Sequence, residues 1–133
     1  MRFFQFLLLL SLSCLITAPV SAECMKDGAV VSLKGKLGRE TFPGAPNYTS
    51  IANGDEPETV WILTLPAPQC FSVISMEDGS LLNSLPMTRF QLVVSEEQYK
   101  LKRNLLDRTV VVKGVIFQGI SGHHHTAALI DAR

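Results

Sequence analysis

The sequence lacks the charge imbalance and the motifs that mark many enzymes and nucleic-acid-binding proteins. Its 133 residues carry 12 basic and 12 acidic side chains, so the formal net charge is zero. A neutral chain gives no support for nucleic acid as a partner, because such a partner favours a basic surface. The chain also has no paired-cysteine zinc pattern, no His-Glu-x-x-His and no Gly-x-Ser-x-Gly. No catalytic residue is therefore assigned, and the chain is not predicted to be an enzyme.

The apolar run near the N-terminus is too short to be a comfortable membrane span. Residues 3–16 are almost wholly apolar and follow Arg2, while Ser21 and Ala22 close the segment with small side chains. This order is typical of a secretory signal peptide, whereas a membrane helix needs about 20 apolar residues. We predict a signal peptide over residues 1–22, cleaved after Ala22, and a periplasmic or secreted protein without stable membrane insertion. Cys14 would allow lipidation instead, but Ser11 stands where a lipoprotein signal would favour leucine.

Cysteine is scarce, with three in the whole chain. Removal of the signal peptide would leave Cys24 and Cys70, and an isolated pair in an oxidising compartment is most simply a disulfide. A redox or metal role for the pair is the less favoured alternative. In the chain-entropy model, closing a loop of this length stabilises the fold by about 4 kcal/mol.

Residues 23–133 are predicted to form a single small domain. A Ser95–Gln98 capping box predicts a helix over residues 96–106. Alternating apolar positions predict strands over residues 29–37, 59–65, 88–94, 110–118 and 127–130. Pro66 and Pro68 are expected to end the second of these, and residues 70–75 are expected to form a further short strand that extends or supplements it. One helix between the third and fourth strands of a small, mainly β chain is the arrangement of an OB-fold, a partly open five-stranded barrel.

Two connections carry the candidate site. Residues 42–58 are dense in proline, glycine and asparagine, and a loop this long in a small domain tends to be functional. The last two strands are predicted to join through a tight turn that holds every histidine of the chain. In an OB-fold these two connections flank the same face, so we expect the long loop to bring Tyr48 or Asp55 close to a histidine. The candidate binding residues are Asn47, Tyr48, Asp55, His123, His124 and His125.

The motifs in these connections resemble those of one bacterial family. These motifs are Pro43-Gly44-Ala45-Pro46-Asn47-Tyr48-Thr49-Ser50-Ile51, Gly54-Asp55, Glu58, Trp61-Ile62-Leu63, Cys70 and Gly122-His123-His124-His125-Thr126. Together they cover most of the chain after the signal peptide and resemble the family called domain of unknown function 4431. The resemblance implies an exported bacterial protein and assigns no activity, ligand or catalytic residue.

Three hypotheses for function are open at this point. The first is an exported binding module whose partner is a protein or a cell-envelope oligosaccharide. The second is a periplasmic metal-binding protein, in which His123 and His125 would bind zinc or copper with an acidic residue of the 55–58 stretch, Asp55 above all. The third is a hydrolase with a histidine-centred site. Hydrogen bonding between the loops, or simple solvation, would also account for the histidines.

Overall fold

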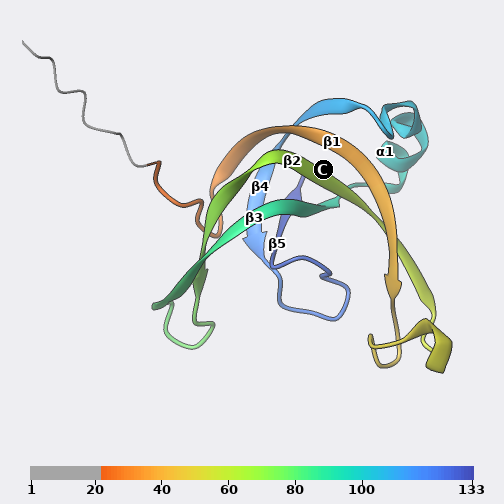
Figure 1. Ribbon diagram of the computed structural model, residues 1–133, viewed down its shortest axis with the longest axis horizontal. Coiled ribbons are helices and arrows are strands. Elements are labelled where there is room, and N and C mark those ends of the chain that lie inside the picture. Colours follow the sequence, from red (N-terminus) through yellow and green to blue (C-terminus); the bar gives the residue numbers. More distant parts are fainter. Residues whose placement is uncertain (1–21) are drawn as a thin grey trace, which may run out of the picture.

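A computed structural model of the protein describes residues 22–133. Residues 1–21 of the predicted signal peptide, Cys14 among them, therefore lie outside the described residues. The elements in chain order are β1 (Val30–Pro43), the 3-10 turn η1 (Ile51–Asn53), β2 (Pro57–Ile74), β3 (Leu81–Val93), α1 (Glu96–Leu101), the 3-10 turn η2 (Arg103–Leu105), β4 (Thr109–Gln118) and β5 (Ala128–Asp131) (Figure 1). The prediction of a mainly β chain with one helix between the third and fourth strands is confirmed. None of the helices in the described part has the length and apolar character that a bilayer crossing requires.

The five strands form one mixed sheet that closes on itself. Their hydrogen-bonded order is β1-β2-β3-β5-β4, and β4 pairs in turn with β1. Only β3 and β5 run parallel to each other. The first half of β1 pairs with β4 and its second half with β2, so that Lys36 is in register with both Thr109 and Thr64. Beside it, Gly35 lies against the Thr64 carbonyl so closely that a side chain would not fit.

The interior is filled by apolar side chains from all five strands. The large side chains that are fully buried are Phe71, Phe90, Leu63, Ile116, Leu129 and Ile130. Three of the four residues of β5 are wholly inaccessible to solvent, because this strand lies between β3 and β4 and is hydrogen-bonded on both edges. Burial of such side chains is the main favourable contribution to folding.

Cys24 and Cys70 form the predicted disulfide. The neighbouring residue Met25 extends the attachment, since its N–H donates to the Cys70 carbonyl over 2.8 Å and its carbonyl accepts from the Ser72 N–H over 2.9 Å. These bonds belong to an isolated parallel bridge between Met25 and Phe71. The start of the domain is therefore fixed to the C-terminal part of β2.

The second strand is longer than predicted. The sequence suggested that Pro66 and Pro68 would end it, yet β2 continues to Ile74. Its register with β3 shifts between Thr64 and Gln69, so the prolines lie where the ladder is irregular and no backbone N–H is needed. Residues 70–74 extend the same strand, and Ser75 lies just beyond it.

The helix is shorter than predicted. It ends at Leu101 and gives way to η2 after Lys102. After η2 the chain is tied to β1, because the Asp107 N–H donates to the Leu37 carbonyl over 2.7 Å and the Leu37 N–H donates to the Arg108 carbonyl over 2.9 Å. The C-cap of the helix is Lys102, whose backbone leaves the helical region with φ of −109° and ψ of 14°, and Asp107 then takes a left-handed conformation with φ of 64°. The connection between β4 and β5 also differs from the prediction. The expected tight turn is wrong, because residues 119–127 form a longer loop.

Candidate functional site

The loop after β1 is built around the carboxylate of Asp55. Its Oδ1 accepts from the Asn47 backbone N–H at 2.9 Å and from Asn47 Nδ2 at 3.1 Å, and its Oδ2 accepts from the Thr49 and Ser50 N–H groups at 2.7 and 2.9 Å. The side chain is only 4% exposed. The bonds from Ser50 and Thr49, followed by those from Asn47, lower the pKa of Asp55 to about 2. Asp55 and Asn47 therefore organise their own loop, and the Asp55 carboxylate bonds the backbone of that loop and not the histidines.

Tyr48 joins this loop to the loop that holds the histidines. It takes a left-handed backbone conformation with φ of 58°, and its ring packs on Gly122, where a Cβ would lie 2.7 Å from two ring carbons. The Tyr48 hydroxyl lies 3.1 Å from His123 Nε2, and the two rings meet edge to face. The predicted contact between the long loop and a histidine is therefore confirmed, with Tyr48 as the contacting residue.

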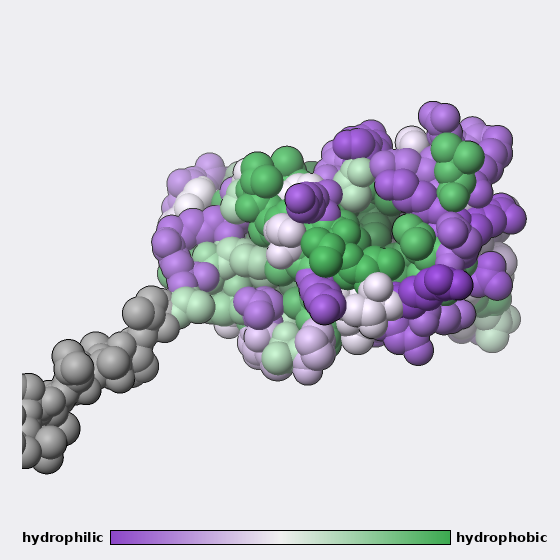
Figure 2. Space-filling model, turned by 90° about the horizontal axis from the view of Figure 1, so that it is seen from above, coloured by the Kyte–Doolittle hydropathy of each residue, from purple (hydrophilic) through white to green (hydrophobic). Residues whose placement is uncertain are grey.

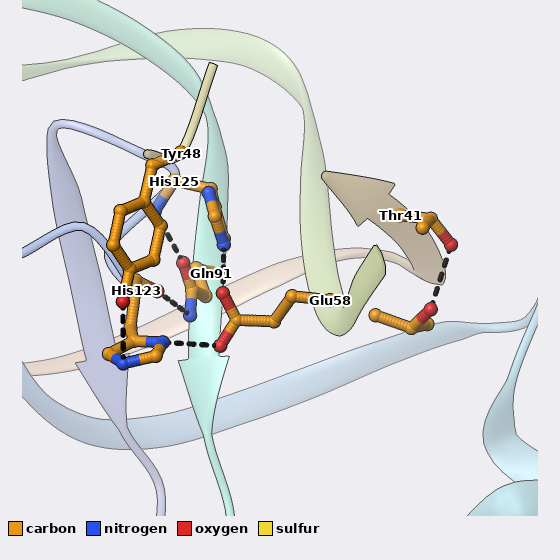
Figure 3. A network of polar contacts seen from close by, with 7 residues as sticks. Thr41, Tyr48, Glu58, Gln91, His123 and His125 are labelled. Atoms are coloured by element: carbon orange, nitrogen blue, oxygen red, sulfur yellow. Dashed lines mark hydrogen bonds and ion pairs between the residues drawn. The ribbon is translucent and has the colours of Figure 1, made fainter. Parts of the chain in front are cut away.

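Glu58, the second residue of β2, connects His123 and His125. Its Oε1 lies 2.7 Å from His123 Nδ1 and its Oε2 lies 2.8 Å from His125 Nε2 (Figure 3). His123 is 61% exposed, whereas His125 is 8% exposed and stacks on Phe42 with ring centroids 4.4 Å apart. Burial opposes ionisation of Glu58, but the hydrogen bonds with His125 and His123 outweigh it and lower its pKa. Glu58 thus takes the place beside the histidines that the sequence had given to Asp55.

Gln91 of β3 holds the backbone of the histidine loop. Its Oε1 accepts from the His125 N–H at 2.7 Å, and its Nε2 donates to the His123 carbonyl at 2.9 Å (Figure 3). The Gln91 backbone N–H donates to Thr126 Oγ1, also at 2.9 Å. The sequence analysis missed Gln91. The signal that could have found it is one polar side chain inside the apolar run of residues 90–94, since a buried amide needs partners.

His124 faces away from this group. Its Nδ1 accepts from the Ile120 N–H at 2.9 Å, and its ring meets Phe117 edge to face. Burial, followed by the charges of His123 and His125, lowers the pKa of His124, as expected for an imidazole that serves as an acceptor. His124 therefore shapes the loop and does not join the surface with the other two histidines. We call the group of Tyr48, Glu58, Gln91, His123 and His125 the loop junction.

A family of known sequences matches the C-terminal third of the chain. Residues 89–133 match the family Domain of unknown function (DUF4431). This is the family that the motifs resembled, and the match covers Gln91, His123 and His125, while Tyr48 and Glu58 lie before it. No curated protein matches the chain.

The chemistry open to the loop junction is set by its bonding. His123 lies between two partners, the Glu58 carboxylate at Nδ1 and the Tyr48 hydroxyl at Nε2. The carboxylate fixes the orientation of the imidazole ring, and the ring nitrogen on the other side faces the tyrosine hydroxyl. Within residues 22–133, no group of three or more His, Cys, Asp and Glu side chains is arranged to hold a metal ion. The side chains of the loop junction are instead arranged as hydrogen-bond donors and acceptors, with distances of 2.7–3.1 Å.

Proposed function

We propose that the protein is an exported binding module with an OB-fold, and that its ligand surface is the loop junction together with the two loops that meet there. The strand order, the parallel β3–β5 pair and the helix between β3 and β4 support the OB-fold assignment. In that fold the connections between strands 1 and 2 and between strands 4 and 5 carry the ligand. These are the two connections that touch here.

The observation that carries the proposal is the contact of Tyr48 and Glu58 with His123. It joins segments far apart in the sequence into one surface and leaves the His123 imidazole largely exposed. An exposed aromatic group beside several hydrogen-bonding groups is suited to an uncharged polar ligand. With no net charge to favour nucleic acid, a cell-envelope oligosaccharide is the ligand class we favour, and a protein surface is the alternative.

The test is an NMR titration of the 15N-labelled chain without its signal peptide. The probe is a soluble, uncharged oligosaccharide of N-acetylglucosamine. We expect saturable shifts confined to residues 44–58, residue 91 and residues 119–127. The affinity should be at least tenfold weaker for His123→Ala, because truncating a hot-spot side chain costs about 2 kcal/mol or more and each 1.4 kcal/mol is tenfold. Asn104→Ala, on η2, is the matched control and should bind normally. No saturable shift would exclude this ligand class, and shifts confined to another face would contradict the assigned surface.

The metal-binding alternative would now use His123, His125 and Glu58. A zinc ion would need each donor about 2.0–2.2 Å away, so it would have to replace both hydrogen bonds of Glu58. We expect zinc and copper to give no concentration-dependent rise in melting temperature, measured on protein without an affinity tag. A melting temperature that rises with metal concentration, and no longer does so in His125→Ala, would instead favour the metal-binding alternative. The hydrogen-bonded loop junction would then not be the functional form of these residues.

A further inference from the structure

The short helix leaves one part of the closed sheet incompletely covered. Neither α1 nor η2 contains a buried residue, and Leu101 is 70% exposed. Tyr99 packs edge to face on Trp61, and Leu105 is half-buried. A longer helix would have placed more apolar side chains on the core, so apolar lining remains open beside α1.

The uncovered part forms an apolar cleft of about 280 Å³. We call it the helix-side cleft. Its lining consists largely of core and half-buried apolar side chains, including Leu37, Trp61, Leu92, Leu105 and Val110. Figure 2 shows the molecule from above, where apolar side chains gather in a hollow between hydrophilic ones. The volume is roughly twice that of a 150 Å³ cavity that holds one benzene ring, so it suits a chain of about ten non-hydrogen atoms.

The charged groups at this cleft are all positive. Lys102, which follows α1, and Lys113 of β4 belong to the lining, and no acidic residue of the described chain does. Neither lysine takes part in an ion pair within residues 22–133. The remaining long polar side chain, Gln98, is already engaged, because its Oε1 accepts from the Ser95 N–H and its Nε2 donates to the Ala132 carbonyl. The two ammonium groups are therefore the polar groups left for a ligand.

We propose that the helix-side cleft binds an anionic amphiphile, with the alkyl chain against Trp61, Leu92 and Val110 and the carboxylate at Lys102 and Lys113. An apolar chain would remove lining side chains from water, and the head group would meet two cations that have no competing carboxylate. The cleft shares no lining residue with the loop junction. This site is therefore additional to the proposed ligand surface, and neither proposal depends on the other.

The sole tryptophan of the chain reports on this cleft, because Trp61 lies in its lining. Decanoate is the probe, titrated against the oxidised chain without its signal peptide. We expect a saturable change in Trp61 fluorescence and a rise in melting temperature with decanoate concentration. The uncharged n-decanol should bind at least threefold more weakly. Lys102→Ala combined with Lys113→Ala should weaken decanoate binding about threefold to tenfold, the range expected for two exposed ion pairs.

Two further variants make the result decisive. Lys100→Ala is the matched control, because Lys100 lies on α1 and pairs with Glu96 outside the cleft; its affinity should not change. Val110→Phe should fill the cleft and abolish binding, with folding checked by circular dichroism. The proposal is overturned if decanoate gives no saturable signal, if decanol binds equally well, or if the double lysine variant binds as tightly as the Lys100→Ala protein.

Discussion

At Gly122 a hydrogen atom occupies the place where any other residue would carry a carbon in contact with Tyr48. A Cβ there would lie 2.7 Å from the ring, so Gly122→Ala must push the two loops apart. We expect a loss of about 1–3 kcal/mol in the free energy of unfolding, the range for overpacking. Urea denaturation measures it.

The same substitution in a Tyr48→Ala background is the control. With the ring removed, Gly122→Ala should cost less than about 0.5 kcal/mol, because the two residues are in direct contact and their effects should not add. An equal cost in both backgrounds would show that the backbone of the histidine loop, and not the Tyr48 ring, requires glycine.

Asp55 makes a prediction about acid. Its folded-state pKa of about 2 lies below the ordinary value of 3.8, so its contribution to stability is fully present above about pH 4 and is lost as the pH falls toward 2. The melting temperature of the wild-type protein should exceed that of Asp55→Asn at pH 6, and the difference should shrink between pH 4 and pH 2.

Because Asp55→Asn retains the other carboxylates, this difference isolates one group from the general acid response. A difference that stays constant from pH 6 to pH 2 would contradict the assignment of the ionised carboxylate as the acceptor for the Thr49 and Ser50 N–H groups. Protease cleavage within residues 44–56 should appear over the same pH range, since the loop depends on these bonds.

Sequence patterns located the participants of the loop junction better than their roles. The expectation that Tyr48 or Asp55 would lie close to a histidine rested on the OB-fold hypothesis, in which the two connections flank one face. In the structure Tyr48 contacts His123. The exchange of Asp55 for Glu58 could not be predicted, since both are acidic and only the loop conformation decides which carboxylate faces its own backbone. Gln91 was missed because a single polar side chain in an apolar strand indicates a buried amide but not which groups that amide contacts.

At the level of the elements, α1 depends on its first turn. The Ser95 hydroxyl accepts from the Gln98 N–H at 3.1 Å, and Gln98 Oε1 accepts from the Ser95 N–H at 2.8 Å. The helix has six residues, too few to be stable alone. Ser95→Ala should therefore lower the free energy of unfolding by about 1 kcal/mol, measured by urea denaturation.

Gln98→Ala provides the comparison. Gln98 also donates to the Ala132 carbonyl at 2.9 Å, so its loss removes the capping bond and the link to the segment after β5. It should cost more than Ser95→Ala. The reverse order would show that the helix is not tied to the end of the chain through this amide.

Element boundaries were less predictable than element order. The order of strands and helix followed from alternation and the capping box, both of which are local signals. The continuation of β2 past Pro66 and Pro68 depends on an irregular register with β3, and the end of α1 depends on bonds between Asp107 and Leu37. Both are contacts between distant segments, which a local pattern does not contain.

For the whole molecule, the disulfide is the largest single constraint outside the core. Cys24 and Cys70 are separated by 46 positions, so replacing both with serine should lower the free energy of unfolding by up to about 4 kcal/mol in the chain-entropy model. Chemical denaturation of the double variant measures the loss. Reduced wild-type protein should behave as the double variant does, and a loss below about 1 kcal/mol would show that the Met25 bridge holds the N-terminal segment without help.

The position of β5 in the chain has a consequence for how the protein is made. This strand is the last of the five in sequence, yet it fills the place between β3 and β4. A chain that emerges N-terminus first from a ribosome keeps the edges of both neighbours unpaired until residues 128–131 have been made. Unpaired edges invite pairing with other chains. During synthesis the sheet therefore stays open between β3 and β4, and pairing of β5 with both strands closes it.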